Sequence, residues 1–296
     1  MKKIKKTFFP LLALLAISVL AITPVGAKTK PMAPGSSTTD MFGVEQVTFV
    51  RSNPFFRLVR VVDDIKSSFA DDKLASRTLL LNQYAARLLK TYEVSPKNDK
   101  LTLEALRDYQ LANYQYGLTL SHFNWSAAGD KLGLSAGIVT TFMSNLRLVD
   151  EMTGWSNLSN AHQAVLGDVK ERMSSVAVAE IESVIGSEKF VSIATEGLSE
   201  KAPVEQLRTA EVFDLIAREA AFKGSNQVAT TLLEQRAAIL TRIAIQGGLA
   251  LVSQIGSAAG SSGERLQTVL FLLNSPELAG NQQLIDLKNL LLIRAF

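Results

Sequence analysis

Apolar residues recur at every third or fourth position along most of this 296-residue chain, and this spacing limits the folds that it can adopt. Two clear stripes are Leu74, Leu81, Ala85, Leu88 and Tyr92, and then Leu103, Leu106, Tyr109, Ala112, Tyr116 and Leu120. Such spacing places apolar side chains on one face of an α-helix, and no alternating series typical of strands accompanies it. The sequence therefore predicts an all-α fold, a multi-helix bundle built from packed helical hairpins.

Residues that start and end helices divide this pattern into segments. Asn53-Pro54 and Asp71-Asp72 suit helix N-termini, where side-chain oxygens and negative charge are favourable. Further helices are expected over 135–152, 160–185, 203–222, 225–246, 264–273 and 282–295. Residues 188–200 have no clear periodicity, and Gly247-Gly248 is expected to weaken or kink the long helix. The chain thus divides into three helical regions, 53–123, 131–200 and 201–296.

The N-terminus has the organisation of a secretory signal peptide. Four lysines precede an uncharged, mainly apolar run over 8–22, and Val25-Gly26-Ala27 supplies the small residues of a cleavage site. The run is shorter than the ~20 residues that span a bilayer. We therefore expect cleavage after residues 1–27 and a flexible tether over 28–52, rich in Pro, Gly and Ser. The protein is expected to be exported, and to be periplasmic, cell-surface or secreted.

Removal of the signal peptide changes the charge balance. The full chain has 31 Lys and Arg against 28 Asp and Glu, a net charge of +3, and four of these lysines lie in residues 1–27. The remaining chain is nearly neutral, so we expect no nucleic-acid partner. The absence of cysteine excludes disulfides, thiolate metal sites, cysteine nucleophiles and a lipid anchor on cysteine. Outside the cytoplasm, such a protein depends on its helical core for stability.

The two histidines form no recognisable metal or catalytic pattern. His122 and His162 are forty positions apart, and neither has a second ligand one helical turn away in a known pattern. His162 lies on the stripe of Leu166, Val169 and Met173, so a packing or capping role is expected. His122 lies near a helix end, where a capping or aromatic contact is expected. We therefore predict no metal, no cofactor and no catalytic residue.

Two acidic pairs and a glycine-rich segment also lack the spacing of known sites. Neighbouring residues of a helix point about 100° apart, so neither Asp63-Asp64 nor Asp71-Asp72 converges as a carboxylate pair. Neither pair has the spacing of a calcium-binding loop. Residues 256–263 lack the lysine and the preceding strand of a phosphate-binding loop, and also the Gly-x-Ser-x-Gly pattern of a nucleophile. A flexible connector between helices is the expected role of this segment.

Two further features leave alternatives open. Five aromatic residues can line a ligand or carbohydrate site, or can pack in the core: Trp125, Trp155, Tyr109, Tyr114 and Tyr116. Residues 243–263 are uncharged, but their glutamines, glycines and serines make a poor membrane-spanning helix. A buried helix followed by a loop is expected there, and membrane contact is the minor alternative.

Two stretches resemble exported helical proteins of bacteria that are known only as a domain of unknown function. The first stretch is 54–69 with the helix ending at 85–89, and the second is 162–185, which opens with His-Gln-Ala-Val-Leu. In that family a signal peptide and tether lead to a Pro-Phe-Tyr/Phe helix, a hairpin, and a helix opening with a His-x-x-Val/Leu-Leu motif. The resemblance covers roughly residues 50–190. This chain is less rich in Lys and Glu than the family, and residues 200–296 have no counterpart. The resemblance implies a bacterial envelope or extracellular setting and assigns no catalytic residue.

Export, a large helical core and the lack of convergent catalytic groups together predict a non-enzymatic protein. We expect a structural or protein-interaction module of the bacterial cell envelope, with an envelope or extracellular protein as partner. The alternative is an exported ligand-binding or hydrolytic protein whose site is built from scattered Asp, Glu, Tyr and His residues. That alternative requires a polar pocket beside one of the aromatic clusters.

Overall fold

A computed structural model describes residues 72–94, 99–154 and 158–257, together with 56, 61–63, 266, 269–270, 272–274, 276 and 278–295. The α-helices are α3 (Lys73–Val94), α4 (Asp99–Ser121), α5 (Lys131–Thr153), α6 (Asn160–Glu180), α7 (Ser187–Ala194), α8 (Pro203–Phe222), α9 (Asn226–Ser257) and α11 (Gln282–Ala295). Shorter elements are the 3₁₀ turns η2 (Trp125–Ala127) and η4 (Leu198–Glu200) and the π-helix η3 (Ile181–Ile185). The described residues contain no strand, so the all-α prediction is confirmed. The expected signal peptide and tether lie outside the described residues.

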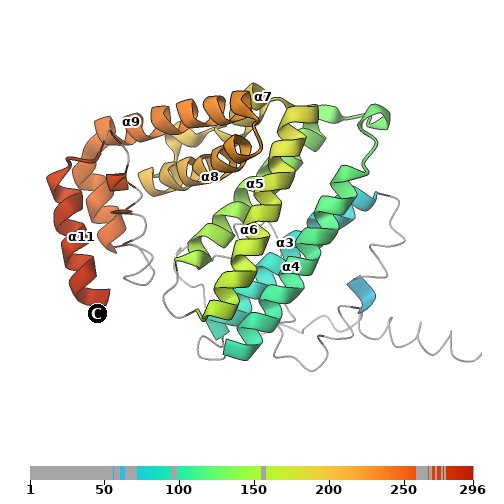
Figure 1. Cartoon of the computed structure of the whole chain (residues 1–296), viewed down its shortest axis with the longest axis horizontal. Helices are drawn as coiled ribbons and strands as arrows, with labels where there is room; N and C mark the ends of the chain where they lie inside the picture. Colours follow the sequence, from blue (N-terminus) through green and yellow to red (C-terminus); the bar gives the residue numbers. More distant parts are fainter. Residues whose placement is uncertain are drawn as a thin grey trace, which may run out of the picture.

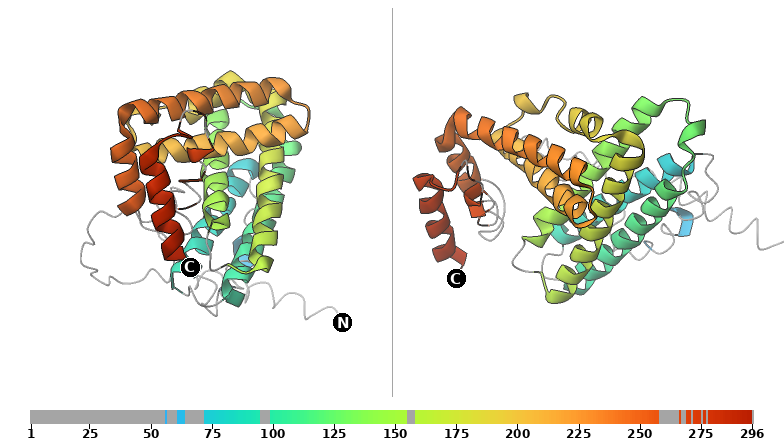
Figure 2. Two further views of the ribbon diagram at one scale, coloured as in Figure 1. Left: turned by 60° about the vertical axis from the view of Figure 1, so that its left-hand side comes forward. Right: turned by 45° about the horizontal axis from the view of Figure 1, so that its top comes forward.

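The first four long helices form a bundle, and a helical hairpin runs across one end of it. Helices α3 and α4 lie side by side, α6 packs against both α4 and α5, and α5 also contacts α3 (Figure 1). The α8–α9 hairpin packs on α5 and α6, and its direction crosses that of the bundle (Figures 1 and 2). Helix α11 packs on α9 at the far end from the bundle (Figure 2). Helices α5 and α6 therefore join the bundle to the hairpin.

One continuous hydrophobic core connects the three helical regions. Its buried side chains run from Phe56 to Leu291 and form a single cluster. At the centre of the bundle, the ring of Tyr116 on α4 meets that of Phe142 on α5 edge to face, with 6.1 Å between the ring centres. A buried polar chain crosses the same core, since the Tyr109 hydroxyl lies 3.0 Å from Asn145 Oδ1. Burial of both aliphatic and aromatic side chains stabilises this core.

Helix boundaries follow the capping chemistry of the sequence at several points. The carboxylate of Asp72 accepts a hydrogen bond of 2.9 Å from the Ala75 backbone N–H, as expected for a residue at a helix start. Pro203 begins α8, where its missing N–H costs nothing. Gly186 ends the π-helix with φ of +81°, a conformation that favours glycine.

Several helix boundaries differ from the sequence-based expectations, and α5, for example, begins at Lys131 and not at 135. The predicted end of the long helix near Gln246 is wrong, because α9 continues through Gly247-Gly248 to Ser257. The helix-forming residues after the glycines offset a cost of about 1 kcal/mol for each glycine, and α9 bends along its length (Figure 1). The region 188–200 contains α7, whose Phe190 and Val191 are buried. The last turn of the helix predicted over 160–185 is a π-helix.

Helix α5 has the length and composition of a membrane-spanning helix. Among the described residues, α5 is the one helix that has both properties, with a mean hydropathy of 1.3. Half of its most apolar segment is buried inside the protein. Helices at the centre of a bundle share these properties. The segment 243–263, the minor candidate for membrane contact, overlaps the end of α9 and continues outside the described residues.

The N-cap of α5 gives a direct stability prediction. The Asp130 carboxylate accepts a hydrogen bond of 2.9 Å from the Gly133 backbone N–H. Replacing a capping Asp by Ala typically costs about 1 kcal/mol. We therefore expect Asp130→Ala to lower the free energy of unfolding by about 1 kcal/mol in urea titrations of the chain without residues 1–27. Asp130→Asn keeps the cap and is expected to lose less, so equal losses for the two variants would contradict this assignment.

Candidate functional site

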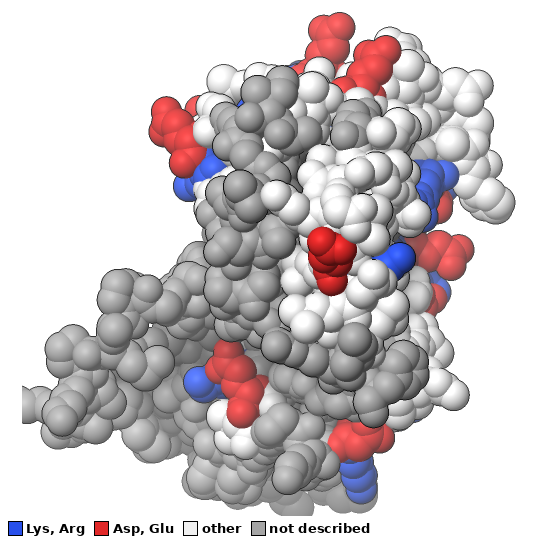
Figure 3. Space-filling model, turned by 90° about the vertical axis from the view of Figure 1, so that its left-hand side faces the viewer, with Lys and Arg blue, Asp and Glu red and all other residues white. Residues whose placement is uncertain are grey.

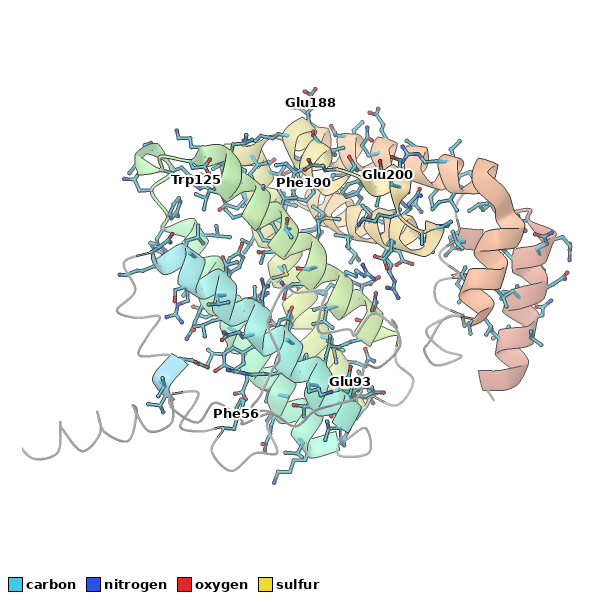
Figure 4. The ribbon with its side chains drawn as sticks, turned by 180° about the vertical axis from the view of Figure 1, so that it is seen from behind. Phe56, Glu93, Trp125, Glu188, Phe190 and Glu200 are labelled. Atoms are coloured by element: carbon cyan, nitrogen blue, oxygen red, sulfur yellow. The ribbon has the colours of Figure 1, made fainter. Side chains whose placement is uncertain are left out.

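A pocket of about 460 Å³ lies between α4 and α6, at the end of the bundle where η2 is located. Helix α4 and η2 form one wall, α6 and η3 form the other, and Lys223 after α8 completes the lining. Figure 4 shows Trp125 at this end of the bundle, close to the connection between α4 and α5. We call this site the Glu180 pocket, after its one acidic residue.

Glu180 is the chemically distinctive group of the pocket. Its side chain is buried, with 6% of the residue exposed, and its Oε2 has no hydrogen-bond partner among the described residues. Burial raises the pKa of the Glu180 carboxyl, and a hydrogen bond with the Trp125 side chain opposes this rise. The charge of Glu180 in turn helps burial to raise the pKa of the neighbouring Tyr116 hydroxyl. No described cation contributes to the shift at Glu180.

Local backbone features place Glu180 in this position. It is the last residue of α6 before the π-helix, and π-helical turns often occur at functional sites because they redirect side chains. Gly117 allows α4 to approach α6 closely, since a Cβ atom there would lie 3.2 Å from Val176 Cγ2. A larger residue at Gly117 would push the two walls of the pocket apart.

The walls of the pocket are aromatic and apolar, and most of its hydroxyl groups are already engaged. The rings of Phe123 and Trp125 meet edge to face, with 5.3 Å between their centres. The Ser121 and Ser183 hydroxyls donate to backbone carbonyls of their own helices. The Lys223 ammonium donates to the carbonyl oxygen and the hydroxyl of Ser175. Glu180 is therefore the lining residue that retains an unused acceptor, its buried Oε2.

Three exposed apolar residues line the pocket or adjoin its lining residues in sequence. We define the pocket rim as Leu118, Val184 and Phe222, which are 44%, 38% and 88% exposed. Val184 lines the pocket, and the other two residues each adjoin a lining residue, Gly117 and Lys223. Among the described residues, Phe222 is the most exposed large apolar side chain.

The structure places His162 in the core, next to two groups that suggest a catalytic triad by residue type alone. Its Nδ1 lies 2.7 Å from Ser159 Oγ and 3.3 Å from Asp99 Oδ1. In a catalytic triad the serine and the carboxylate contact opposite ring nitrogens. Here both contact the same nitrogen, while the buried Nε2 has no partner among the described residues. This arrangement anchors the start of α6 to α4 and does not activate a nucleophile.

The remaining sequence candidates do not converge. His122 lies at the end of α4, with its Nδ1 2.8 Å from the Leu118 carbonyl oxygen, and it does not line the pocket. Asp63 pairs with Arg87 at 2.9 Å, which is a contact between helical segments. Asp64, Asp71, Trp155 and most of 256–263 lie outside the described residues. No group of three His, Cys, Asp or Glu side chains in the described part of the chain is placed to hold a metal ion.

The five aromatic candidates have different environments. Tyr109 and Tyr116 are buried in the core, so they do not form the wall of an open site. Tyr114 is exposed, and the Arg172 guanidinium lies 5.6 Å from its ring centre. Trp125 alone of the described candidates lines the Glu180 pocket.

A second cluster of ionisable groups lies where α5, α6 and α8 meet. Its cations and carboxyl groups are Arg147, Lys170, Arg208, Asp150, Glu151, Glu205 and Glu211. Arg147 binds both carboxylate oxygens of Glu205, at 2.5 and 2.9 Å, a geometry that guanidinium favours. Burial, and to a lesser degree the charges of Asp150 and Glu151, raise the pKa of Glu211 to about 8. With Glu211 protonated, the three other carboxylates match the three cations in number.

Charged side chains elsewhere are dispersed. On the side of the molecule formed by α11 and the end of α9, the visible Lys and Arg side chains lie singly and near Asp or Glu (Figure 3). The described residues on this face therefore form no extended surface of one sign.

Comparisons with known proteins add no assignment. No family model matches the chain, and no curated protein or solved structure matches it. The function of the Glu180 pocket must therefore be argued from its own chemistry.

Proposed function

We propose that this chain is an exported, non-enzymatic helical protein that binds an envelope or extracellular protein in a bacterium. The observation that carries the proposal is the apolar rim of the Glu180 pocket, where Phe222 is 88% exposed. Aromatic side chains of this kind act as anchors in protein interfaces, because they bury a large area at low cost in conformational entropy. The signal-like N-terminus and the family resemblance support export and a bacterial envelope setting.

The chemistry of the described residues favours binding over turnover. Neither histidine lines the pocket, and the Ser159–His162–Asp99 contacts lack the geometry of an activated nucleophile. The Arg147 guanidinium and its carboxylate partners are bound to one another. The rim and the pocket thus offer contacts to a partner, but they present no assembled acid, base and nucleophile.

Site-specific crosslinking in cells tests this proposal. A photoreactive phenylalanine analogue in place of Phe222 is expected to give a discrete adduct, identified by mass spectrometry. The matched control is Val94, an apolar residue that is 57% exposed at the end of α3. It adjoins Glu93, which Figure 4 shows at the opposite end of the bundle from Trp125. Equal labelling at both positions, or robust turnover of a defined substrate by the purified chain, would contradict the proposal.

Ligand binding is the second candidate, because the Glu180 pocket combines aromatic walls with a free buried acceptor. A hydrolytic site built on the tyrosines is less well supported, since Tyr109 and Tyr116 are closed in the core. Binding of a small molecule to the purified chain, without consumption of that molecule, would favour this candidate over the first.

A further inference from the structure

We infer that the Glu180 pocket binds a protonated amine or guanidinium group on an apolar stem, with an N–H of that group donating to the Glu180 carboxylate. This inference rests on the proposed function, in which the group is a Lys or Arg side chain of the partner protein. A free organic amine offers the same chemistry.

The unused acceptor of Glu180 favours a cationic ligand. A buried carboxylate normally accepts several hydrogen bonds, and one left without a partner costs free energy. Glu180 Oε2 has no such partner among the described residues, although Glu180 is 94% buried and lines a pocket large enough for a side chain. A cationic donor would supply both the missing hydrogen bond and the missing charge.

The composition of the pocket walls also favours a cation on an apolar stem. The aromatic rings of Phe123 and Trp125 flank the pocket, and aromatic faces attract ammonium and guanidinium groups. The apolar side chains of Leu120, Val176 and Val184 complete a lining that suits the methylene stem of such a ligand.

Lys223 is the one cation of the pocket lining, and its contacts do not favour an anionic ligand. Its ammonium is held by Ser175 and lies 3.7 Å from Glu219 Oε1, so an acidic group already meets its charge. The charge of Lys223 does not shift the pKa of Glu180. An anionic ligand would have to displace these contacts and would also meet the Glu180 carboxylate.

Trp125 provides a direct readout of binding. The chain has two tryptophans, so Trp155→Phe leaves Trp125 as the only one. Phenethylammonium is expected to change the fluorescence of this variant in a saturable manner, and the neutral isostere 2-phenylethanol is expected to bind about tenfold more weakly or worse. Calorimetry on the chain with both tryptophans provides a second measurement if Trp155→Phe does not fold.

Variants of Glu180 decide the assignment. Glu180→Gln keeps the shape of the side chain but removes its charge, and is expected to weaken phenethylammonium binding by about tenfold or more. Glu180→Asp keeps the charge and is expected to recover part of the affinity. The matched control is Glu182→Gln, because Glu182 is an exposed carboxylate in the same π-helix. Equal binding by Glu180→Gln and Glu182→Gln, or equal affinity for the amine and the alcohol, would overturn the inference.

The source of the cation is tested by a second probe. Nα-acetyl-lysine methylamide presents a lysine side chain as a protein does, and its neutral norleucine analogue is the control. Tighter binding of the lysine derivative than of phenethylammonium supports a protein side chain, and the reverse order supports a free amine. Cation binding without a crosslinked partner at Phe222 would overturn the proposed function and retain the site. A crosslinked partner without cation binding would overturn the cation site and retain the proposed function.

Discussion

Phe142→Ala is expected to lower the free energy of unfolding by about 3–5 kcal/mol, the largest stability loss that we predict for a single substitution. Phe142 is fully buried at the centre of α5, where its ring packs against that of Tyr116. Truncation removes the buried aromatic surface and leaves a cavity that rigid neighbouring helices fill only in part. Urea denaturation of the purified chain without residues 1–27 measures this loss.

The matched control for Phe142→Ala is another large apolar residue of the same helix. Leu132 is 66% exposed at the start of α5, so Leu132→Ala is expected to change the free energy of unfolding by no more than about 0.5 kcal/mol. Similar effects for the two variants would contradict the burial of Phe142 in the core. That result would also reopen a membrane-facing position for α5, because the same helix has the composition of a membrane span.

Glu211→Gln is expected to remove a large part of the pH dependence of stability. Burial raises the pKa of Glu211 from its ordinary value of 4.5 to about 8 in the folded protein. Between these two values the unfolded chain releases a proton that the folded chain retains, so stability falls as the pH rises. The fall is roughly 1.4 kcal/mol per pH unit, and it ends above the folded-state pKa.

Two urea titrations, at about pH 5.5 and about pH 7.5, test the role of Glu211. The unaltered protein is expected to lose about 2–3 kcal/mol more than Glu211→Gln over this interval. Other groups titrate equally in both proteins and cancel in the comparison. Glu171 is an exposed acid on α6, and Glu171→Gln is expected to retain the full pH dependence. A Glu211→Gln variant with the same pH dependence as the unaltered protein would show that Glu211 is ionised in the folded state.

The parts of the fold that sequence reasoning predicted depend on local chemistry. The stripe from Leu74 to Tyr92 predicts α3, and Asp72 caps that helix. Pro203 and Phe222 bound α8 as predicted. Helix α7 and the π-helix were missed for different reasons. Helix α7 has only eight residues, too few for a clear stripe, and the π-helix has the same sequence pattern as the α-helix that it ends.

The groups that make the candidate site could not be found from sequence, because their properties arise from tertiary contacts. Glu180 and Glu182 lie two residues apart near the end of a helix, and nothing local indicates that Glu180 is buried or contacts Trp125. Glu211 becomes unusual because tertiary packing buries its carboxyl group, with a smaller contribution from the charges of Asp150 and Glu151 on α5. The sequence predicts that Trp125 either lines a ligand site or packs in the core, and in the structure it does both. Where residue type leaves the role of a side chain open, its burial and tertiary contacts are needed to assign that role.

The most direct test measures whether crosslinking at Phe222 on the rim depends on Glu180 in the pocket. The crosslinking residue at Phe222 is placed in three chains: the unaltered one, one with Glu180→Gln and one with Glu182→Gln. If a partner protein docks on the rim and inserts a cationic group beside Glu180, the adduct should decrease strongly with Glu180→Gln and persist with Glu182→Gln. Equal adduct yields in all three chains would contradict the assignment of the Glu180 pocket and its rim as one partner-binding surface.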